Sequence, residues 1–228
     1  MCGRYALFGK ADKMQDHYRV AHDFQWEPRY NLAPTDKVPV LQIDSGFKRV
    51  LSLASWGFTG STTKGTSLLI NARAETVLEK PTFRELARVS RCVLPANGFY
   101  EWSQKDASKT PRFMSPKASK TVFFSMAGLM RFTEEEGELK QETVILTTTA
   151  NNAIKPFHER MPVLLSKHEI QDWLNPNLSF PKEFAMRPDD SEQMIIQLAS
   201  TSVNKAGAEG AALLVPDIPS LPRQPSLF

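Results

Sequence analysis

The chain has 228 residues, of which 41% are hydrophobic and 23% charged, with a formal net charge of +3. These values are typical of a globular protein with one sizeable core. They exclude a strongly cationic protein that coats nucleic acid, so a nucleic-acid partner would have to meet a local basic patch. Two cysteines, Cys2 and Cys92, are too few for a disulfide framework or a cysteine-rich zinc site. Because the sequence also has no apolar run of signal-peptide or membrane-spanning length, we expect a cytoplasmic protein without a membrane partner.

The first third of the chain predicts short elements in which strands dominate. Residues 4–8 read as a strand, and residues 10–20 as a surface helix with Met14 and Tyr18 on one face. Alternating apolar residues predict a strand over 38–43, and after a turn at Gly46 a second strand follows over 49–56. Residues 57–67 are mostly Gly, Ser, Thr and Lys, which predicts a mobile loop.

The rest of the chain continues this pattern. Capping boxes at Thr82 with Glu85 and at Ser166 with Glu169 each predict the start of a helix. Residues 181–186 read as a short helix, and the acidic 134–138 as a hairpin tip or solvated loop. Residues 68–76 begin with a buried strand and end with polar residues, and 91–102 alternate apolar residues with a Pro-Ala-Asn-Gly turn. Further strands are predicted over 109–114, 121–132, 142–149, 194–198 and 213–215. Many short strands without regular βαβ alternation indicate an α+β fold: a single domain with a mainly antiparallel, barrel-like sheet and several short helices.

The second residue has a chemistry of its own. Methionine aminopeptidases generally remove Met1 when the next side chain is small, which leaves Cys2 with a free α-amine beside its thiol. The amine of such a 1,2-aminothiol condenses with an aldehyde to a Schiff base, and the thiol then closes a thiazolidine ring. Alternatively, the thiolate attacks an acyl group. A buried, inert cysteine is the other interpretation of this position.

Three further stretches hold polar residues that packing does not require. They are the NAR sequence at Asn71 to Arg73, Glu101 between two aromatic residues, and the HER sequence at His158 to Arg160. Each has a structural interpretation when taken alone, as a turn residue, a buried paired carboxylate, a structural histidine or surface salt-bridge arginines.

Taken together, the motifs of this sequence resemble those of the SOS response-associated peptidase (SRAP) family, the abasic-site-crosslinking proteins. The matching stretches run in the family's order over about residues 2–215: MCGRY at the start, YNLAPT at 30–35, INARAET at 70–76, LPANGFYEW at 94–102, AGLM at 127–130, TTTAN at 147–151 and HERMPVLL at 158–165. The resemblance implies a domain over 1–215 that binds single-stranded DNA and captures an abasic site through Cys2.

The resemblance also implies roles for four catalytic residues. Cys2 forms the covalent bond, and Asn71 holds the Cys2 amine or the sugar by hydrogen bonds. Glu101 moves protons during Schiff-base formation and ring closure, with a pKa raised by its aromatic neighbours. His158 protonates the sugar ring oxygen, or assists dehydration and any β-elimination that cuts the strand.

The DNA-binding residues implied by the resemblance lie in the same motifs. Arg4, Arg73 and Arg160 bind the phosphates beside the lesion without reading sequence, and the TTTAN motif adds Thr148 and Thr149. The sequence departs from the family after Trp56, where WGFTGSTTKGTS lacks the usual proline and second tryptophan, so Phe58 becomes the candidate for base stacking. Met130 and Arg112 also replace aromatic residues that are frequent in the family, and either packing or a phosphate contact explains these two changes.

The composition changes at the end of the chain. Prolines at 216, 219, 222 and 225 predict an extended tail over 216–228. Its last five residues, QPSLF, resemble a sliding-clamp-binding peptide in which Gln224, Leu227 and Phe228 contact the partner. The alternative is that this terminus packs back on its own domain.

Two other functions remain open from the sequence. One is a cysteine peptidase that uses Cys2 as its nucleophile, for example to release Met1, and the other is a non-covalent module that binds single-stranded DNA. Scattered histidines and the lack of a glycine-rich phosphate loop predict no metal and no cofactor. We expect a monomer.

Overall fold

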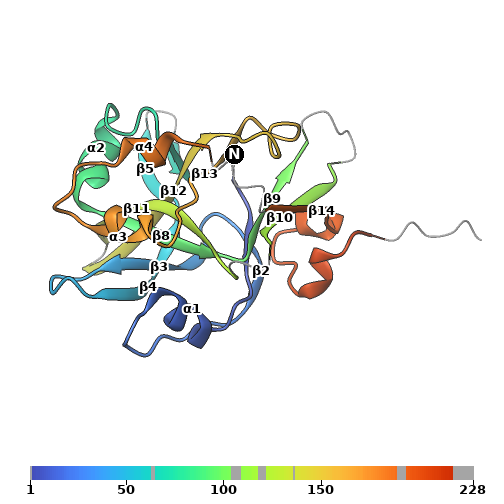
Figure 1. The fold of residues 1–228 in the computed structure, drawn as a ribbon, viewed down its shortest axis with the longest axis horizontal. Coiled ribbons are helices and arrows are strands. Elements are labelled where there is room, and N and C mark those ends of the chain that lie inside the picture. The colour runs from blue at the N-terminus through green and yellow to red at the C-terminus, as the bar shows by residue number, and fades with distance from the viewer. Residues whose placement is uncertain are drawn as a thin grey trace, which may run out of the picture.

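Strands dominate the computed structural model of the chain, which describes residues 2–62, 65–103, 109–117, 122–135, 137–188 and 194–217 (Figure 1). The strands form two larger sheets, and the short helices lie around them. This arrangement confirms the predicted α+β fold with a barrel-like sheet.

The larger sheet closes into a barrel. Its five ring strands are neighbours in the order β11 (Phe124–Glu135), β8 (Arg91–Ala96), β3 (Lys37–Ile43), β4 (Arg49–Trp56) and β12 (Glu138–Thr149), and β12 pairs again with β11. All of these pairings are antiparallel except that of β12 with β4. Two short strands extend the sheet from β12: β7 (Asn71–Arg73), which is parallel to it, and β13 (Arg160–Pro162), which is antiparallel.

The second sheet is antiparallel and has five strands. They are neighbours in the order β14 (Met194–Leu198), β10 (Pro111–Pro116), β9 (Gly98–Trp102), β1 (Tyr5–Leu7) and β2 (Arg29–Leu32). The segment over 91–102, predicted as alternating apolar residues with a Pro-Ala-Asn-Gly turn, passes from the barrel into this sheet at Asn97, because β8 and β9 belong to different sheets. Asn97 Oδ1 accepts the backbone N–H groups of Phe8 and Gly9, which ties the passage to the end of β1.

Four short helices lie around the barrel, and capping residues or proline mark the start of two of them. They are α1 (Ala11–Tyr18), α2 (Pro81–Val89), α3 (Glu169–Leu174) and α4 (Lys182–Met186). The capping box at α3 is confirmed, because Ser166 N donates to Glu169 Oε2 and Glu169 N donates to Ser166 Oγ. The box at Thr82 is wrong: α2 starts at Pro81, whose fixed φ suits a first helical position, so Thr82 already lies inside the first turn.

Residues 57–67 were expected to form a loop and instead build most of a β-hairpin, β5 (Phe58–Thr62) with β6 (Gly65–Leu69). Gly57 turns the chain out of the barrel with φ +122°. A fully buried carboxylate of the barrel then fixes the hairpin: Glu142 Oε1 accepts Thr59 N at 3.0 Å and Thr59 Oγ1 at 2.7 Å. Arg131 binds Glu142 Oε2 at 2.6 Å and lies over the Phe58 ring at 4.6 Å.

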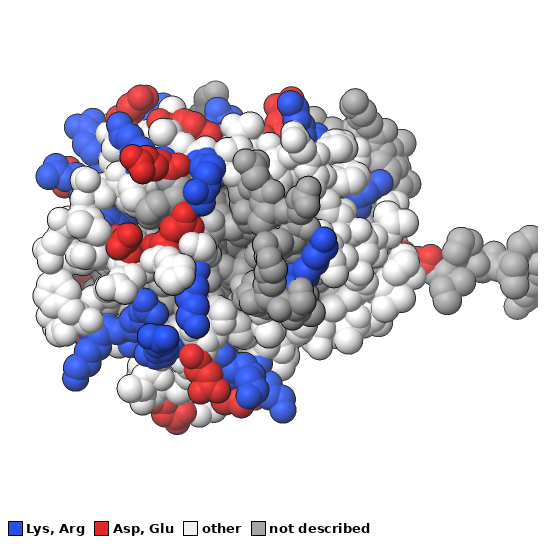
Figure 2. Space-filling model, in the orientation of Figure 1, with Lys and Arg blue, Asp and Glu red and all other residues white. Residues whose placement is uncertain are grey.

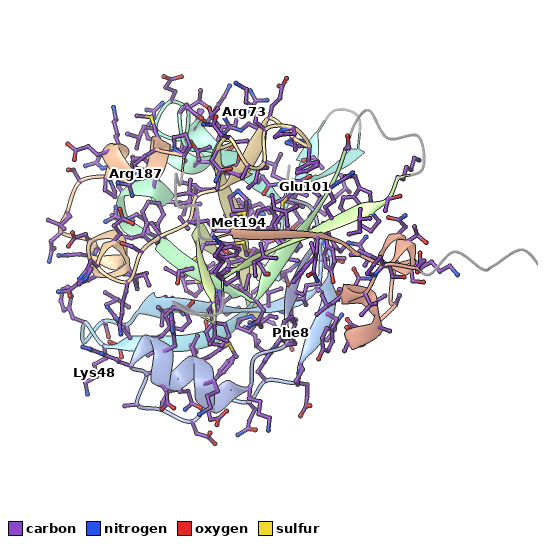
Figure 3. All side chains as sticks on the ribbon, turned by 45° about the vertical axis from the view of Figure 1, so that its right-hand side comes forward. Phe8, Lys48, Arg73, Glu101, Arg187 and Met194 are labelled. Atoms are coloured by element: carbon purple, nitrogen blue, oxygen red, sulfur yellow. The ribbon has the colours of Figure 1, made fainter. Side chains whose placement is uncertain are left out.

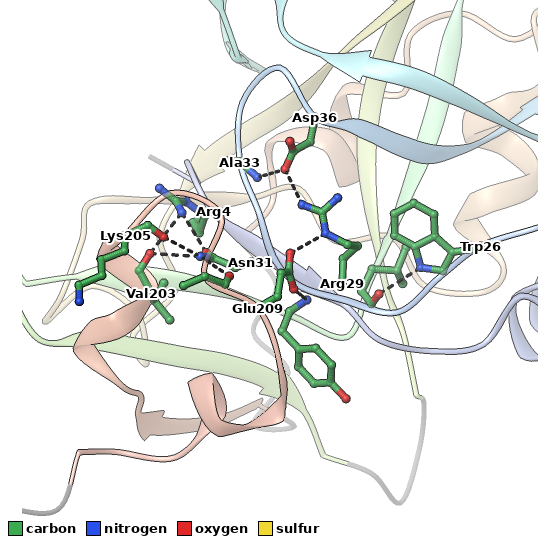
Figure 4. A network of polar contacts seen from close by, with 12 residues as sticks. Arg4, Trp26, Arg29, Asn31, Ala33, Asp36, Val203, Lys205 and Glu209 are labelled. Carbon is green, nitrogen blue, oxygen red and sulfur yellow. Dashed lines mark hydrogen bonds and ion pairs between the residues drawn. The ribbon is translucent and has the colours of Figure 1, made fainter.

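The segment after β14 also differs from the prediction. Residues 213–215 do not form a strand, and the chain makes two 3₁₀ turns instead, Thr201–Asn204 and Ala211–Leu214. A polar network holds these turns against β2 (Figure 4). In it Asn31 Nδ2 donates to the carbonyls of Val203, Lys205 and Ala208, and Glu209 binds both Arg29 and the backbone N–H of Tyr30. Glu209 thereby accepts a backbone N–H of β2, the edge strand of this sheet, so that this donor is not open to pairing with another strand.

Two sequence predictions concern membrane spans and the end of the domain. No helix among the described residues is long and apolar enough to cross a membrane. The predicted boundary at 215 stays a prediction, since residues 218–228 lie outside the described part of the chain.

We expect Glu142→Gln to lower the free energy of unfolding by about 2–4 kcal/mol, because it leaves Arg131 without its buried charge partner. Burial raises the pKa of Glu142, but hydrogen bonds from Arg131 and Thr59 outweigh it and place the pKa below its usual range. The stabilisation is therefore present above about pH 4.3, the usual pKa of an unfolded-state glutamate, and is lost as the pH falls through the lower folded-state pKa.

Urea unfolding at neutral pH and at successively lower pH values measures both effects. The matched control is Glu138→Gln, which makes the same chemical change at the exposed first residue of β12. A constant difference between wild type and Glu142→Gln at all pH values would contradict the assignment.

Candidate functional site

Cys2 lies where the barrel and the second sheet meet, because it contacts Asn71 of β7 and leads into β1; Figure 1 marks the N-terminus of the chain. The strand that follows it, β1, pairs with β9, and Tyr100 N donates to the carbonyl of Arg4 at 2.9 Å. From the barrel side, Asn71 Nδ2 donates to the carbonyl of Cys2 at 3.0 Å. Cys2 is fully buried in the chain that still carries Met1. An element from each sheet therefore fixes the second residue, although chain ends are usually loosely held.

Glu101 is the charged neighbour of Cys2. It lies on β9 and is 3% exposed. Burial raises the pKa of the Cys2 thiol well above its usual range, and the negative charge of Glu101 raises it further. Burial also raises the pKa of Glu101 itself. The predicted pairing of Cys2 with Glu101 in one site is therefore present in the fold, and the pair favours the protonated thiol.

Asn71 begins β7, and its side-chain amide also carries an acceptor, Oδ1. Its Oδ1 atom is buried and has no hydrogen-bond partner among the described residues. Side chains two positions apart on a strand share a face, so Arg73 lies on the Asn71 side of β7, and it is exposed. Figure 3 shows Arg73 and Glu101 in the upper half of the molecule.

His158 ends a turn that leads into β13. Its Nδ1 accepts the backbone N–H of Arg160 at 2.9 Å, so a neutral His158 ring carries its proton on Nε2. Burial is the main cause that lowers the pKa of His158 below its usual value. The structure therefore presents a mostly neutral imidazole with a fixed tautomer at neutral pH.

Arg160 and the threonines of β12 lie beside β7. Arg160 makes a two-point ion pair with Glu75 at 2.7 and 2.8 Å and donates to the Thr147 carbonyl at 2.6 Å. On the opposite edge of β12 from β13, Thr147 is in register with Arg73 of β7. Thr149 is exposed, whereas Thr148 is buried and donates its hydroxyl to the Met186 carbonyl. Two predicted phosphate-binding arginines thus lie on either side of one strand.

Two other predicted DNA-binding residues have structural partners. Arg4 Nη1 donates to Asn31 Oδ1 at 2.9 Å and to the Val203 carbonyl at 3.2 Å (Figure 4). Phe58 is 1% exposed and packs between Arg131 and Phe83, so its ring is not open to a base in this conformation. Their proposed contacts with DNA stay predictions.

A cation–π contact of Arg112 lies beside the site. Arg112 is the cross-strand neighbour of Glu101, and its guanidinium lies 4.6 Å from the centre of the Phe157 ring. Since Phe157 precedes His158, this cation–π contact links the glutamate strand to the histidine turn. The only signal in the sequence was the arginine at a position where an aromatic is usual.

The remaining predictions concern metals and the tail. No cluster of three His, Cys, Asp or Glu side chains suited to a metal ion occurs among the residues that the structure describes. Gln224, Leu227 and Phe228 lie outside those residues, so the clamp peptide stays a prediction.

The fold and the site together define a class of proteins: a closed β-barrel joined to a second sheet, with a buried cysteine directly after the initiator methionine and a carboxylate beside it. The chain belongs to the SOS response associated peptidase (SRAP) family, which it matches over residues 1–206.

Several known proteins are similar to this chain over most of their own length. The abasic site processing protein YoaM of Bacillus subtilis is 34% identical over 223 residues, which cover 94% of this chain and 97% of YoaM. The abasic site processing protein HMCES of Gallus gallus is 29% identical, over 88% of this chain and 69% of its own. A Bacteroides thetaiotaomicron protein of known crystal structure superposes with a TM-score of 0.80 at 25% identity, over 95% of this chain and all of its own.

We expect Glu101→Gln to make the Cys2 thiol easier to alkylate. Removing the carboxylate removes a charge that raises the thiol pKa, so the pH dependence of the iodoacetamide rate shifts to lower pH. Peptide mass mapping distinguishes Cys2 from Cys92, and a Cys2→Ala variant gives the Cys92 rate alone. An unchanged profile, or one shifted to higher pH, would show that Glu101 does not act on the thiol.

Proposed function

We propose that this protein processes abasic sites in single-stranded DNA by forming a thiazolidine between the mature Cys2 and the opened deoxyribose. The observation that carries the proposal is the position of Cys2: its carbonyl is held by Asn71 and its thiol lies beside the buried Glu101. The relatives named abasic site processing proteins support the same substrate. A thiazolidine also explains why the cysteine occupies the second position, because only an N-terminal cysteine has both nucleophiles.

The chemistry proceeds by condensation without oxidation or reduction. The α-amine nitrogen attacks the aldehyde carbon C1′, and the resulting carbinolamine loses one water to give a Schiff base. The Cys2 sulfur then adds to the same carbon while its proton passes to the nitrogen, which closes the ring. Glu101, whose pKa is raised by burial, is suited to donate the proton to the leaving water and to accept the thiol proton.

The raised thiol pKa supports attack by the amine first. An ordinary α-amine has a pKa of about 8 and is partly neutral near pH 7, whereas the thiol beside Glu101 is kept protonated. A thiol peptidase requires the reverse, since its cysteine is activated by a lowered pKa. The same observation therefore favours the crosslinking function over the peptidase alternative.

The DNA-binding part of the proposal rests on the face around β7. Arg73 is exposed on the side of Asn71, and Arg160 lies across β12, where it is paired with Glu75. Phosphates beside the lesion bind Arg73 directly, and they compete with Glu75 for Arg160. Such contacts position the strand without reading its sequence.

Intact-mass analysis after incubation with an abasic single-stranded oligonucleotide tests the crosslink. Wild type with Met1 removed gains the mass of the oligonucleotide less one water. We expect no adduct with Cys2→Ala or with a form in which an N-terminal tag keeps the Cys2 amine blocked. Cys2→Ser retains the amine, so it gives a Schiff base that borohydride traps but no adduct that survives without reduction.

These variants separate the three functions. A stable adduct of Cys2→Ala, or of the tagged form, would sink the thiazolidine mechanism. Peptide turnover that depends on Cys2 in the absence of an adduct would favour the peptidase. Binding without any covalent product in all forms would leave a non-covalent DNA-binding module.

The pH dependence of crosslinking tests His158 as a proton donor. The amine requires deprotonation near pH 8, and the imidazolium form of His158 is lost above a pKa that lies below about 6.5. Between these two pKa values the deprotonated amine increases with pH while the imidazolium form of His158 decreases. The two effects cancel, so the logarithm of the wild-type crosslinking rate is level there. We expect His158→Gln to react more slowly and its rate to rise through the same interval, in single-turnover measurements across the pH range. A variant profile parallel to that of wild type would exclude this role.

A further inference from the structure

A groove lies on the barrel between α2, the α3–α4 connection and the turn that joins β3 to β4. Three adjoining depressions of about 710, 470 and 250 Å³ form it, and they share Val89, Pro176, Asn177 and Phe47 among their lining residues. None of the residues assigned to the Cys2 site lines it. Figure 3 places Lys48, at the β3–β4 turn, at the lower left and Glu101 in the upper half of the molecule.

One end of the groove is basic. Arg19 and Arg49 both line the 470 Å³ part, and within the described residues neither forms an ion pair. Arg49 donates to the Tyr18 carbonyl, which brings the end of α1 to the β3–β4 turn. Figure 2 shows Lys and Arg side chains gathered over this part of the surface, at the lower left. Among the described residues, no carboxylate lines the part that holds the two arginines.

The centre of the groove is apolar and exposed. Phe47 is 62% exposed, Val89 65%, Phe132 49% and Leu178 43%. Phe47 has a φ of +59°, a left-handed conformation that is strained for a bulky side chain and is usually occupied by Gly or Asn. The Phe47 N–H donates to the Asp44 carbonyl and the Asp44 N–H to the Lys48 carbonyl, so the left-handed residue closes the tight β3–β4 turn and presents its aromatic ring at the surface.

A buried arginine makes the groove rigid. Arg91 is 6% exposed and donates to the carbonyls of Ala87, Arg88, Trp173, Asn175 and Leu178. These bonds fix the α3–α4 connection, which forms one wall, against α2, which forms the other. The Arg91 guanidinium lies 5.8 Å from the centre of the Trp173 ring and its hydrogen-bond acceptors are carbonyls, so no carboxylate among these contacts neutralises its positive charge.

We propose that this groove binds a short peptide segment of a partner protein, with acidic residues at one end and apolar residues beside them. Carboxylates of the segment pair with Arg19 and Arg49, whose planar guanidinium groups suit carboxylate oxygens. Its apolar side chains cover Phe47, Val89 and Phe132, as in other grooves that take extended or helical segments. A single-stranded nucleic acid is the competing occupant, because its bases stack on aromatic rings such as Phe47 and Phe132. The aliphatic Val89 and Leu178 beside these rings favour the peptide, and competition with DNA separates the two.

The two carboxylates that line the rest of the groove do not neutralise the basic end. Asp44 accepts the backbone N–H groups of Gly46 and Lys48 in the β3–β4 turn, and Glu183 lines only the 710 Å³ part. The charge of the groove therefore selects an acidic segment over a basic one.

Selection of random peptides on phage tests the proposal. Peptides are selected on the full-length wild-type protein, counter-selected on the Phe47→Asp/Arg49→Glu double variant, and then synthesised with a fluorescent label for anisotropy titrations. We expect selected peptides to combine Asp or Glu with Leu or Phe and to bind Arg49→Glu about tenfold or more weakly, a typical effect of losing a charge-assisted contact. Lys48→Glu, a matched charge reversal at an exposed neighbour that does not line the groove, is expected to keep the affinity.

Phe47→Gly separates binding from folding. Glycine accepts the left-handed conformation without strain, so the urea midpoint stays level or rises while peptide affinity falls. The proposal is overturned if no acidic peptides are enriched, or if the selected peptides bind all variants equally. It is also overturned if undamaged single-stranded DNA displaces them in competition, or if a chain ending at Asp217 binds them more tightly because its own tail no longer occupies the groove.

Discussion

The hydrogen bond from Asn71 to the carbonyl of Cys2 is the contact on which the organisation of this protein depends. It joins the barrel, through β7, to a segment that continues as β1 of the second sheet. A chain end would otherwise fray, and a nucleophile on a frayed end has no fixed position. Holding residue 2 from both sheets places its amine and thiol in a defined geometry. The network around Asn31 does the same for Arg4, since it connects this residue to the C-terminal turns of the domain.

Burial at the sheet junction then sets the protonation states. Cys2 and Glu101 are both removed from water, which raises the pKa of each, and the negative charge of Glu101 raises the pKa of the Cys2 thiol further. The thiol is thus kept protonated near neutral pH, the pKa of the Glu101 carboxyl group is raised, and burial lowers the pKa of His158. A site of this kind is poor at generating a thiolate and good at exchanging protons with a bound carbonyl compound. For the proposed crosslink, the electrostatics and the N-terminal position of the cysteine both favour an order in which the amine reacts first.

The sequence predicted those elements whose signals are local. The periodicity of Met14 and Tyr18 gave α1, the alternation over 38–56 gave β3 and β4, and the capping box of Ser166 gave α3. It failed where distant side chains decide: the glycine- and threonine-rich 57–67 segment becomes a hairpin because Glu142, 83 residues after Thr59, binds its backbone. The motifs named the residues of the site, but they could not show that Arg4 and Phe58 are already engaged by the fold, because those partners come from remote segments.

The groove and the Cys2 site use different parts of the same barrel. The site is built at the end where β7, β12 and β13 meet the second sheet, whereas the groove lies by α2 and the β3–β4 turn, and the two share no lining residue that we have assigned. Arg91 fixes the groove walls through backbone carbonyls alone, so its shape does not depend on what occupies the site. A covalently bound DNA strand at Cys2 would then leave the groove accessible. A partner segment held there could therefore remain attached throughout the lifetime of the adduct, and binding of the partner would not require release of the DNA.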